Sequence, residues 1–265
     1  MKSLVINAVL VSVFIVSCST VPITGRKQLS LIPGSTMLSM SFQQYDDFLH
    51  SNTLSTNQQQ TALVKRVGTN IQKAVEQYFA QKGMSDQLSG YQWETNLVES
   101  KEVNAWCMPG GKIVVYTGIL PVTQTEAGLA VVMGHEVAHA VAEHGNERMS
   151  QGLLAQLGGM GLALALEKKP EETKALWMTA FSVGAQYGAL LPFSRLQESE
   201  ADELGLTFMA MAGYNPNEAV SFWERMSQSG GQAPPEFMST HPSNETRIAD
   251  IRKHLPEAMK YYHPH

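Results

Sequence analysis

The chain has 265 residues, 43% of them hydrophobic, which is enough to bury a proper core in one large domain or two small ones. Its formal net charge at pH 7 is −5 and its sequence pI is about 5.9. Because basic residues are not in excess, nucleic acid is excluded as an expected partner.

The first residues predict an export signal. Lys2 precedes an apolar run from Leu4 to Val16, which is too short for an ordinary transmembrane helix and is typical of the core of a signal peptide. The run ends in IVSC at residues 15–18, which resembles a bacterial lipobox, where the signal is cut before a cysteine that is then lipidated. We expect a signal peptide at residues 1–17 and an acylated Cys18, with an uncleaved membrane anchor as the alternative.

This interpretation places the protein in a bacterial cell envelope as an exported lipoprotein that faces the periplasm or the exterior. Residues 18–40 mix Pro, Gly, Ser and Thr with single hydrophobic residues, which is typical of a tether, and residues 41–265 are left for the folded domain. Besides Cys18 the only cysteine is Cys107, so no disulfide is expected within the domain. A half-buried position in a strand is the preferred interpretation of Cys107 over a catalytic nucleophile.

Residues 56–80 carry apolar side chains at helical spacing and predict a scaffold helix. Three short stretches then predict strands at residues 91–98, 103–106 and 113–116, with a Pro-Gly-Gly turn between the last two. A β-hairpin or meander is therefore expected directly before the next helix.

That helix is predicted at residues 123–145, TQTEAGLAVVMGHEVAHAVAEHG. Thr123 and Glu126 form a capping-box pattern at its start, and Gly145 is placed for a C-terminal cap. The run between them is rich in Ala, Val, Leu and Met, so the helix should be buried on most sides. Ionisable residues inside such a helix require a functional reason.

His135 and His139 lie four residues apart and therefore share one face of this helix, where two imidazoles can bind a single metal ion. Glu136 is close enough to polarise a water at that ion. This pattern is typical of zinc hydrolases. In such enzymes an edge strand borders the cleft and can pair with an extended peptide. Residues 103–111, VNAWCMPGG, are the candidate for that strand, and an ordinary structural hairpin is the equal alternative.

Residues 151–191 are rich in Gly, Ala and Leu and are interrupted by charges from Glu167 to Lys174. Each apolar half is short for a bilayer span and contains a glutamine. We expect a helical hairpin packed over the domain that can touch a membrane. The alternative is a pair of membrane segments, which would make the protein a transmembrane protease.

The stretch from Ser194 to Gly213 predicts a helix with Ser194 as its N-cap, Gln197 at the third position and Gly213 as its stop. Glu198 and Asp202 share one face of it, either as functional carboxylates or as part of a solvated face.

A further helix is predicted at residues 215–227, where Phe222 and Trp223 serve for packing. Residues 227–235 form a polar, glycine-rich stretch that could be a loop over a cleft. His241 and a short helix with Arg247 follow.

A catalytic zinc usually has three protein ligands and an open position, so one ligand is missing from the helix. The candidates are Glu198, Glu200, Asp202, His144 and His241. His144 follows His139 by five residues, which turns it away from the metal face, and a structural role is preferred for it.

Five stretches recur together and in order: NAWCMPGGKIVVYTGIL, GHEVAHAVAEHGNERMS, LLPFSRLQESEAD, AGYNP and STHPSNETRI. In them the chain resembles the zinc endopeptidases that include HtpX and the CAAX prenyl proteases, and most of all the exported BepA-like and LoiP-like members. The resemblance implies a mainly helical α+β, zincin-like metallopeptidase with a small β-sheet whose edge strand borders the active-site cleft. It also implies one zinc ion per chain.

The family's Glu-x-x-Ala-Asp element matches residues 198–202, which implies that Glu198 is the third zinc ligand and that Asp202 orients a ligand histidine. Its His-Pro element matches His241 and Pro242, and its arginine matches Arg247. The resemblance places His241 near the open zinc position, where it either donates a hydrogen bond to the oxyanion or occupies the site in a resting state.

The implied function is an endopeptidase of misfolded or misassembled cell-envelope proteins, in which Glu136 takes a proton from zinc-bound water. The substrate would pair with residues 103–107 and contact the main chain of Asn104 and Ala105. The expected partners are polypeptide substrates and, through the lipid anchor, a membrane. The alternative function is a lipid-anchored chaperone or assembly factor whose zinc site is largely closed.

Overall fold

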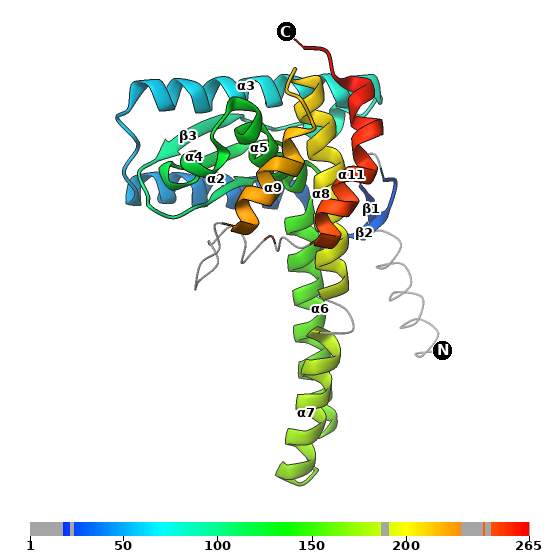
Figure 1. Cartoon of the computed structure of the whole chain (residues 1–265). Coiled ribbons are helices and arrows are strands. Elements are labelled where there is room, and N and C mark those ends of the chain that lie inside the picture. Colours follow the sequence, from blue (N-terminus) through cyan, green and yellow to red (C-terminus); the bar gives the residue numbers. More distant parts are fainter. Residues whose placement is uncertain (1–17, 22–23, 187–190, 229–240, 242–244, 265) are drawn as a thin grey trace. The chain divides into compact units, whose positions relative to one another are not determined.

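The computed structural model describes residues 18–21, 24–186, 191–228, 241 and 245–264 (Figure 1). The predicted signal peptide at residues 1–17, Pro242 and nearly all of the predicted loop at residues 227–235 lie outside the described residues. The lipidation of Cys18 and the tether at residues 18–40 stay predictions.

The chain divides into two compact units. The sheet unit joins residues 35–142 to residues 198–265, and the hairpin unit joins residues 1–34 to residues 143–197. The sheet unit contains the predicted metal helix and every residue that the sequence proposes as a ligand, apart from His144.

A three-stranded sheet forms in the sheet unit. Its strands are β3 (Glu94–Val98), β4 (Ala105–Met108) and β5 (Lys112–Tyr116), in the order β3-β5-β4. β3 runs parallel to β5, and β4 runs antiparallel to it, so the predicted hairpin of β4 and β5 is confirmed. Its turn contains Gly110 and Gly111, whose φ angles of 88° and 81° are readily adopted only by glycine. β4 is left at the edge of the sheet, as the fold class requires.

Helices surround this sheet, as expected for a mainly helical α+β fold. The predicted scaffold helix is confirmed as α3, which the Asn57 side chain caps by accepting a hydrogen bond from the Gln60 amide. The described α-helices that lie in or run into the sheet unit are α2 (Gly34–Ser51), α3 (Gln58–Gln81), α4 (Leu120–Thr123), α5 (Glu126–Val141), α8 (Leu191–Met211), α9 (Glu218–Gln228) and α11 (Glu245–Ala258). The 3-10 helices are η1 (Ser85–Leu88), η2 (Thr117–Ile119) and η4 (Met259–Tyr261).

Both predicted ends of the metal helix α5 are wrong by a few residues. Its N-cap is Thr125, whose hydroxyl accepts a hydrogen bond from the Gly128 amide, whereas Thr123 ends the preceding short helix α4. At the other end, Glu143 takes the left-handed conformation with φ 57°, and Gly145 already belongs to the next helix. A non-glycine residue therefore makes the turn that the sequence assigned to glycine.

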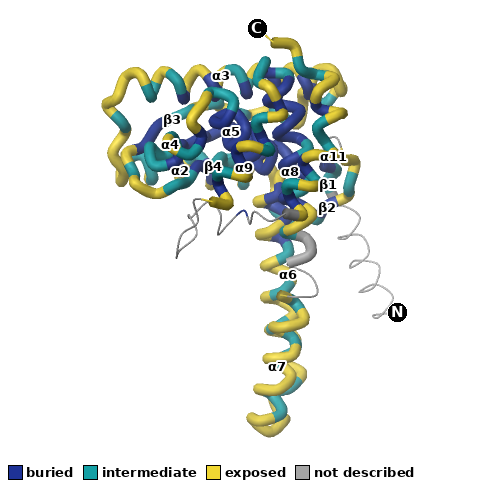
Figure 2. Tube along the Cα trace, viewed as in Figure 1, coloured by how far each residue is buried: buried dark blue, intermediate teal, exposed yellow. Residues whose placement is uncertain are grey.

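α5 forms the centre of the sheet unit, and every residue from Gly128 to Val141 is buried (Figure 2). It packs against β4, α3 and α9. On the opposite face of β4, Trp106 packs edge-on against Tyr45 and Phe48 of α2. The edge strand is thus fixed between an aromatic cluster and the helix that carries the two histidines.

Two glycines allow α8 to cross α5 at backbone contact. A β-carbon added to Gly205 would lie 2.9 Å from the backbone nitrogen of His135, and one added to Gly134 would lie 2.9 Å from the Gly205 carbonyl oxygen. Because a larger residue at either position would separate the helices, these glycines set how closely the α8 carboxylates approach the α5 histidines.

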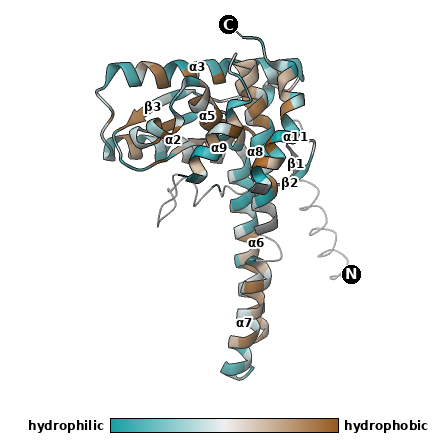
Figure 3. Ribbon diagram, viewed as in Figure 1, coloured by the Kyte–Doolittle hydropathy of each residue, from teal (hydrophilic) through white to brown (hydrophobic). Residues whose placement is uncertain are grey.

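The hairpin unit contains the predicted helical hairpin, formed by α6 (His144–Ala165) and α7 (Glu171–Ala185), which lie side by side (Figure 1). The Phe181 ring packs where Gly158 and Gly159 leave room for it. Large apolar side chains remain exposed along both helices. Figure 3 shows hydrophobic residues, in brown, along the two helices. Among the described residues, no helix is long and apolar enough to cross a membrane.

A short β-hairpin of β1 (Cys18–Thr20) and β2 (Lys27–Leu29) joins α6 in this unit. Arg26, which precedes β2, donates two hydrogen bonds of 2.7 and 2.8 Å to the buried Glu147 carboxylate. Gln197 also donates to Glu147, at 2.7 Å, and so does not serve the predicted cap. Ser194 is not an N-cap either, because α8 begins one turn earlier, at Leu191.

Candidate metal centre

Four buried side chains from three parts of the sheet unit converge on one point. His135 and His139 come from α5, Glu198 comes from α8, and His241 lies shortly before α11. One ligand atom from each lies within 4.8 Å of the other three. The structure therefore brings together the two helical histidines, the expected third ligand and the histidine expected at the open position.

The distances within this cluster suit a metal ion. His135 Nε2 lies 3.1 Å from His139 Nε2 and 3.1 Å from His241 Nδ1. The Glu198 carboxylate lies 3.3 Å from each α5 histidine and 2.8 Å from His241 Nδ1. Ligands that surround zinc tetrahedrally at its usual bond lengths are about 3.3 Å apart. Three nitrogens and one carboxylate oxygen at this spacing fit a zinc ion in both chemistry and size.

Asp202 and Arg247 support the cluster from behind. Asp202 Oδ1 lies 2.9 Å from His135 Nδ1, the ring nitrogen that faces away from the other ligands. Arg247 donates to both Asp202 oxygens, with distances of 2.8 Å from Nε and 2.7 Å from Nη2, and its Nη1 lies 3.3 Å from Glu198. Asp202 is thus placed where it can orient the His135 ring, and Arg247 is placed where it can orient Asp202.

Burial and neighbouring charges shift the pKa values of the ionisable residues in this cluster. Burial opposes ionisation of Glu198, but three histidine neighbours outweigh it and lower the pKa of Glu198. Burial and Arg247 lower the pKa of His135, and the Asp202 and Glu198 carboxylates outweigh them and raise it to about 9. Burial likewise opposes ionisation of Asp202, and Arg247 lowers its pKa. Both carboxylates therefore favour the ionised form that metal binding requires.

Glu136 is buried next to the cluster, with Oε1 3.4 Å from His241 Nε2. One ring nitrogen of His241 thus lies among the ligand atoms, while the other faces the carboxylate expected to act as the base. Burial and the Glu136 charge raise the pKa of the Cys107 thiol. A thiol that stays protonated is a poor nucleophile, which supports the structural interpretation of Cys107.

The predicted substrate-binding residues lie at the start of the edge strand, where their main-chain groups already have partners. The Asn104 carbonyl accepts a hydrogen bond from the Tyr116 amide and so pairs into the sheet. The Ala105 amide donates to the Asn104 side chain at 2.8 Å. A peptide that pairs with Ala105 through this amide must therefore displace the Asn104 side chain.

The other candidate ligands are buried but do not join the cluster. Glu200 lies on α8 and His144 begins α6, and neither belongs to the metal-binding group found among the described residues. The preferred structural interpretation of His144 agrees with this arrangement. Sequence reasoning gave Trp223 only a packing role, although its ring lies 3.6 Å from the Arg247 guanidinium carbon. No spacing rule could have indicated this contact, because the two residues lie on different helices.

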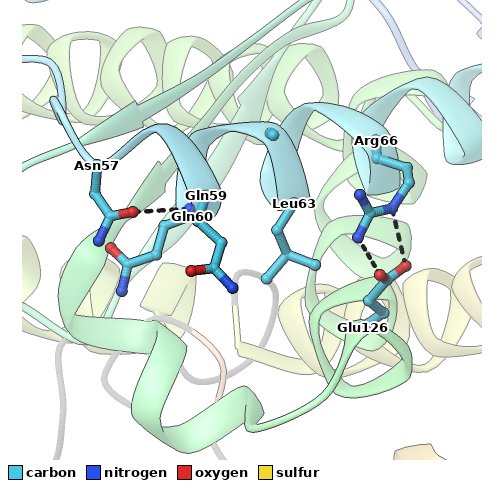
Figure 4. Close-up of a pocket in the computed structure, with 7 residues that line it drawn as sticks. Asn57, Gln59, Gln60, Leu63, Arg66 and Glu126 are labelled. Carbon is cyan, nitrogen blue, oxygen red and sulfur yellow. Dashed lines mark hydrogen bonds and ion pairs between the residues drawn. The ribbon is translucent and has the colours of Figure 1, made fainter.

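A separate pocket of about 620 Å³ lies along the N-terminal half of α3 (Figure 4). It is lined mainly by amide and charged side chains, including Asn57, Gln60 and the ion pair of Arg66 with Glu126. Glu126 begins α5 and is about 13 Å along the helix axis from His135, so this pocket is distinct from the metal centre.

A buried helix that presents two histidines and a glutamate, completed by a glutamate from a second helix and bordered by an edge strand, defines a zincin-like metallopeptidase. The sequence profile of peptidase family M48 matches residues 65–255. The chain belongs to this family.

Individual relatives agree with this assignment. The chain is 37% identical over 191 residues to the mitochondrial metalloendopeptidase OMA1 of Schizosaccharomyces pombe, covering 71% of this chain and 53% of the relative. It is 30% identical over 250 residues to the human metalloendopeptidase OMA1, covering 90% of this chain and 46% of the relative. The chain thus spans about half the length of these relatives.

A bacterial relative matches less of the chain. The β-barrel assembly-enhancing protease of Escherichia coli is 28% identical over 162 residues, covering 59% of this chain and 33% of the relative. The BepA-like part of the predicted resemblance thus finds a partial counterpart, whereas the family itself is shown directly.

The predicted localisation is wrong. Relatives that match at higher identity and over more of the chain are named as mitochondrial proteins, which overturns the expectation of an exported bacterial envelope lipoprotein. The expectation depended on a short apolar run followed by IVSC at residues 15–18, and hydrophobicity over so few residues does not specify a compartment.

Proposed function

We propose that this chain is a zinc-dependent endopeptidase with His135, His139 and Glu198 as the metal ligands. The observation that carries the proposal is the cluster of buried ligand atoms within 4.8 Å of one another, at spacings that suit a tetrahedral ion. Membership of family M48 supports the same reaction class.

A bound zinc ion would supply Lewis acidity, lowering the pKa of water and polarising the scissile carbonyl. Glu136 is the general base: its carboxylate takes the proton of the attacking water and returns it to the leaving amine. His241 Nε2, which faces Glu136 at 3.4 Å, donates a hydrogen bond to the oxyanion that develops on the carbonyl.

We assign substrate binding to the edge strand β4, which packs along α5. An extended peptide would add to this strand through main-chain hydrogen bonds after the Asn104 side chain leaves the Ala105 amide. Because main-chain pairing requires an extended segment and reads little side-chain sequence, the supported substrate class is unfolded or misassembled polypeptide.

The test is the Glu136→Gln variant with an unfolded substrate such as casein. The amide cannot act as a base, so cleavage should fall at least about 10²- to 10⁴-fold, while one zinc ion per chain stays bound. Metal content is measured by elemental analysis on the same sample. Glu94→Gln, on strand β3, is the matched control and should leave both cleavage and zinc unchanged. Undiminished cleavage by Glu136→Gln would refute the proposal.

A second function is favoured by one observation: His241 Nδ1 lies among the ligand atoms, where it would fill the position that a catalytic zinc keeps open. A site closed in this way fits a chaperone or assembly factor that binds unfolded chains with little turnover. His241→Ala separates the two functions. It should raise proteolysis if His241 closes the site and lower it if His241 only stabilises the oxyanion.

A further inference from the structure

The Arg247 guanidinium lies beside the metal cluster and is held from two directions. Its edge donates to the Asp202 carboxylate, and its Nη1 reaches Glu198 at 3.3 Å. Its face lies on the indole ring of Trp223, with 3.6 Å from the guanidinium carbon to the ring centroid. A planar cation held at both edge and face has little freedom to turn.

Trp223 is placed to hold the guanidinium from this face. It comes from α9, is almost fully buried, and presents its ring nearly perpendicular to His135 at a centroid distance of 6.2 Å. Its indole is the best of the aromatic faces for a cation, and the attraction is stronger where water is excluded, as around Arg247 here.

The orientation of Arg247 matters because Asp202 fixes the His135 ring. Asp202 Oδ1 accepts from Arg247 Nη2 at 2.7 Å and lies 2.9 Å from His135 Nδ1. If Arg247 turned, Asp202 would lose its two-point contact, and the Nε2 of His135 would be less well aimed at the other ligand atoms. Groups that orient metal ligands in this manner typically change metal affinity 10- to 100-fold when they are lost.

We propose that Trp223 is a positioning residue of the metal centre, which sets zinc affinity by holding Arg247 in the orientation that orders Asp202 and His135. The inference deepens the proposed function, because it rests on the same zinc site. It does not depend on turnover, since its consequence is a change in zinc affinity.

The test measures zinc dissociation constants by competition with a chromophoric chelator, on the full chain. Trp223→Met removes the aromatic face and should weaken zinc binding about 10- to 100-fold. Trp223→Phe keeps a smaller face and should weaken it only about threefold. Phe79→Met is the control for the loss of an equally buried aromatic ring, because Phe79 lies on α3, which carries no residue of the metal cluster, and it should leave zinc affinity unchanged.

A double-mutant cycle that combines Trp223→Met with Arg247→Gln shows whether Trp223 acts through the Arg247 guanidinium. In that background Trp223→Met should have no further effect on zinc affinity, because the group it positions is gone. Independent, additive losses would overturn the inference, as would equal losses for Trp223→Met and Phe79→Met. If Trp223→Met fails to fold, wild-type affinity in Trp223→Phe overturns it.

The same measurements keep the two proposals apart. Wild-type chain that binds zinc but cleaves no polypeptide contradicts the endopeptidase, while a graded loss of zinc affinity across the Trp223 variants still supports the inference. Active wild-type chain whose zinc affinity is insensitive to Trp223 contradicts only the inference.

Discussion

Helices α5 and α6 follow one another along the chain and are both rich in small and apolar residues, yet they meet opposite surroundings. α5 is buried continuously from Gly128 to Val141, whereas the large apolar side chains of α6 are exposed, with Leu157 at 54% and Leu164 at 72%. α5 buries His135, Glu136 and His139 at the metal cluster, whereas the buried polar residues of α6 lie in its first two turns.

The difference shows that hydropathy alone does not tell which helix forms a core. What distinguishes α5 is that it carries His135, Glu136 and His139 among apolar neighbours, since buried ionisable groups are retained only where partners or a metal ion compensate their desolvation. The following predictions compare the two helices directly.

Zinc removal should give the largest difference in stability between α5 and α6. With zinc at about a thousandfold over its dissociation constant, metal binding stabilises the folded protein by about 4 kcal/mol. Chelation should therefore speed amide hydrogen exchange in α5, where two ligands lie, and leave exchange in α6 and α7 unchanged. Peptide-resolved mass spectrometry measures both. The Glu198→Gln variant is the control, and its exchange rates should change little when chelator is added. Equal acceleration of exchange in α5 and α6 would contradict the prediction.

Truncating one leucine in each helix comes next. Leu129→Ala in α5 empties a fully buried site and should lower the unfolding free energy by about 3 kcal/mol. Leu157→Ala in α6 should change it by less than about 0.5 kcal/mol, because its side chain is half exposed. Urea denaturation measures both values. A cost at Leu157 as large as that at Leu129 would mean that another molecule or surface covers α6 in solution.

Adding one methyl group tests the helix crossing. Gly205→Ala places a β-carbon against the His135 backbone, so it should cost about 1–3 kcal/mol and weaken zinc binding. The control is Gly152→Ala in α6, where a β-carbon meets nothing within 4 Å and should stabilise the helix by about 0.5–1 kcal/mol. Thermal unfolding with a zinc titration distinguishes them. Unchanged zinc affinity in Gly205→Ala would show that the crossing can widen without consequence.

The smallest effect is expected at the exposed end of α5. Arg66 pairs with Glu126, and both side chains are partly exposed, at 53% and 40%. Since water and salt screen such pairs, Arg66→Gln should change the unfolding free energy little and leave cleavage unaffected. Denaturation at low and high salt measures this. A loss of activity would instead connect the pocket along α3 to the metal centre.

Much of the fold follows from local pattern. The spacing of His135 and His139, the apolar stripe of α3 and the glycine turn before β5 each depend on a few neighbouring residues, and all are found where the sequence indicates. Gly213 likewise follows α8 with a φ of 81°, as a helix stop should.

The sequence does not predict a feature correctly where several nearby residues suit the same role and contacts with distant residues determine which of them fills it. Thr123 and Thr125 are both acceptable caps, and only the short helix α4 makes Thr125 the real one. Glu198 could be selected from the residues alone only as one candidate among several carboxylates, because its proximity to the α5 histidines depends on the Gly134–Gly205 crossing. The contact of Trp223 with Arg247 belongs to the same class, since it joins α9 to α11.

The spacing of the ligands along the chain has a consequence for the metal-free protein. His139 and Glu198 are separated by roughly 60 residues, so an ion shared between them closes a long loop, much as a cross-link would. Loops of this length lose about 4 kcal/mol of unfolded-state entropy when they are tied. Zinc would then stabilise the fold as a reversible cross-link in addition to its role in catalysis. A cell that withholds the metal would therefore shorten the lifetime of the protein as well as lower its activity.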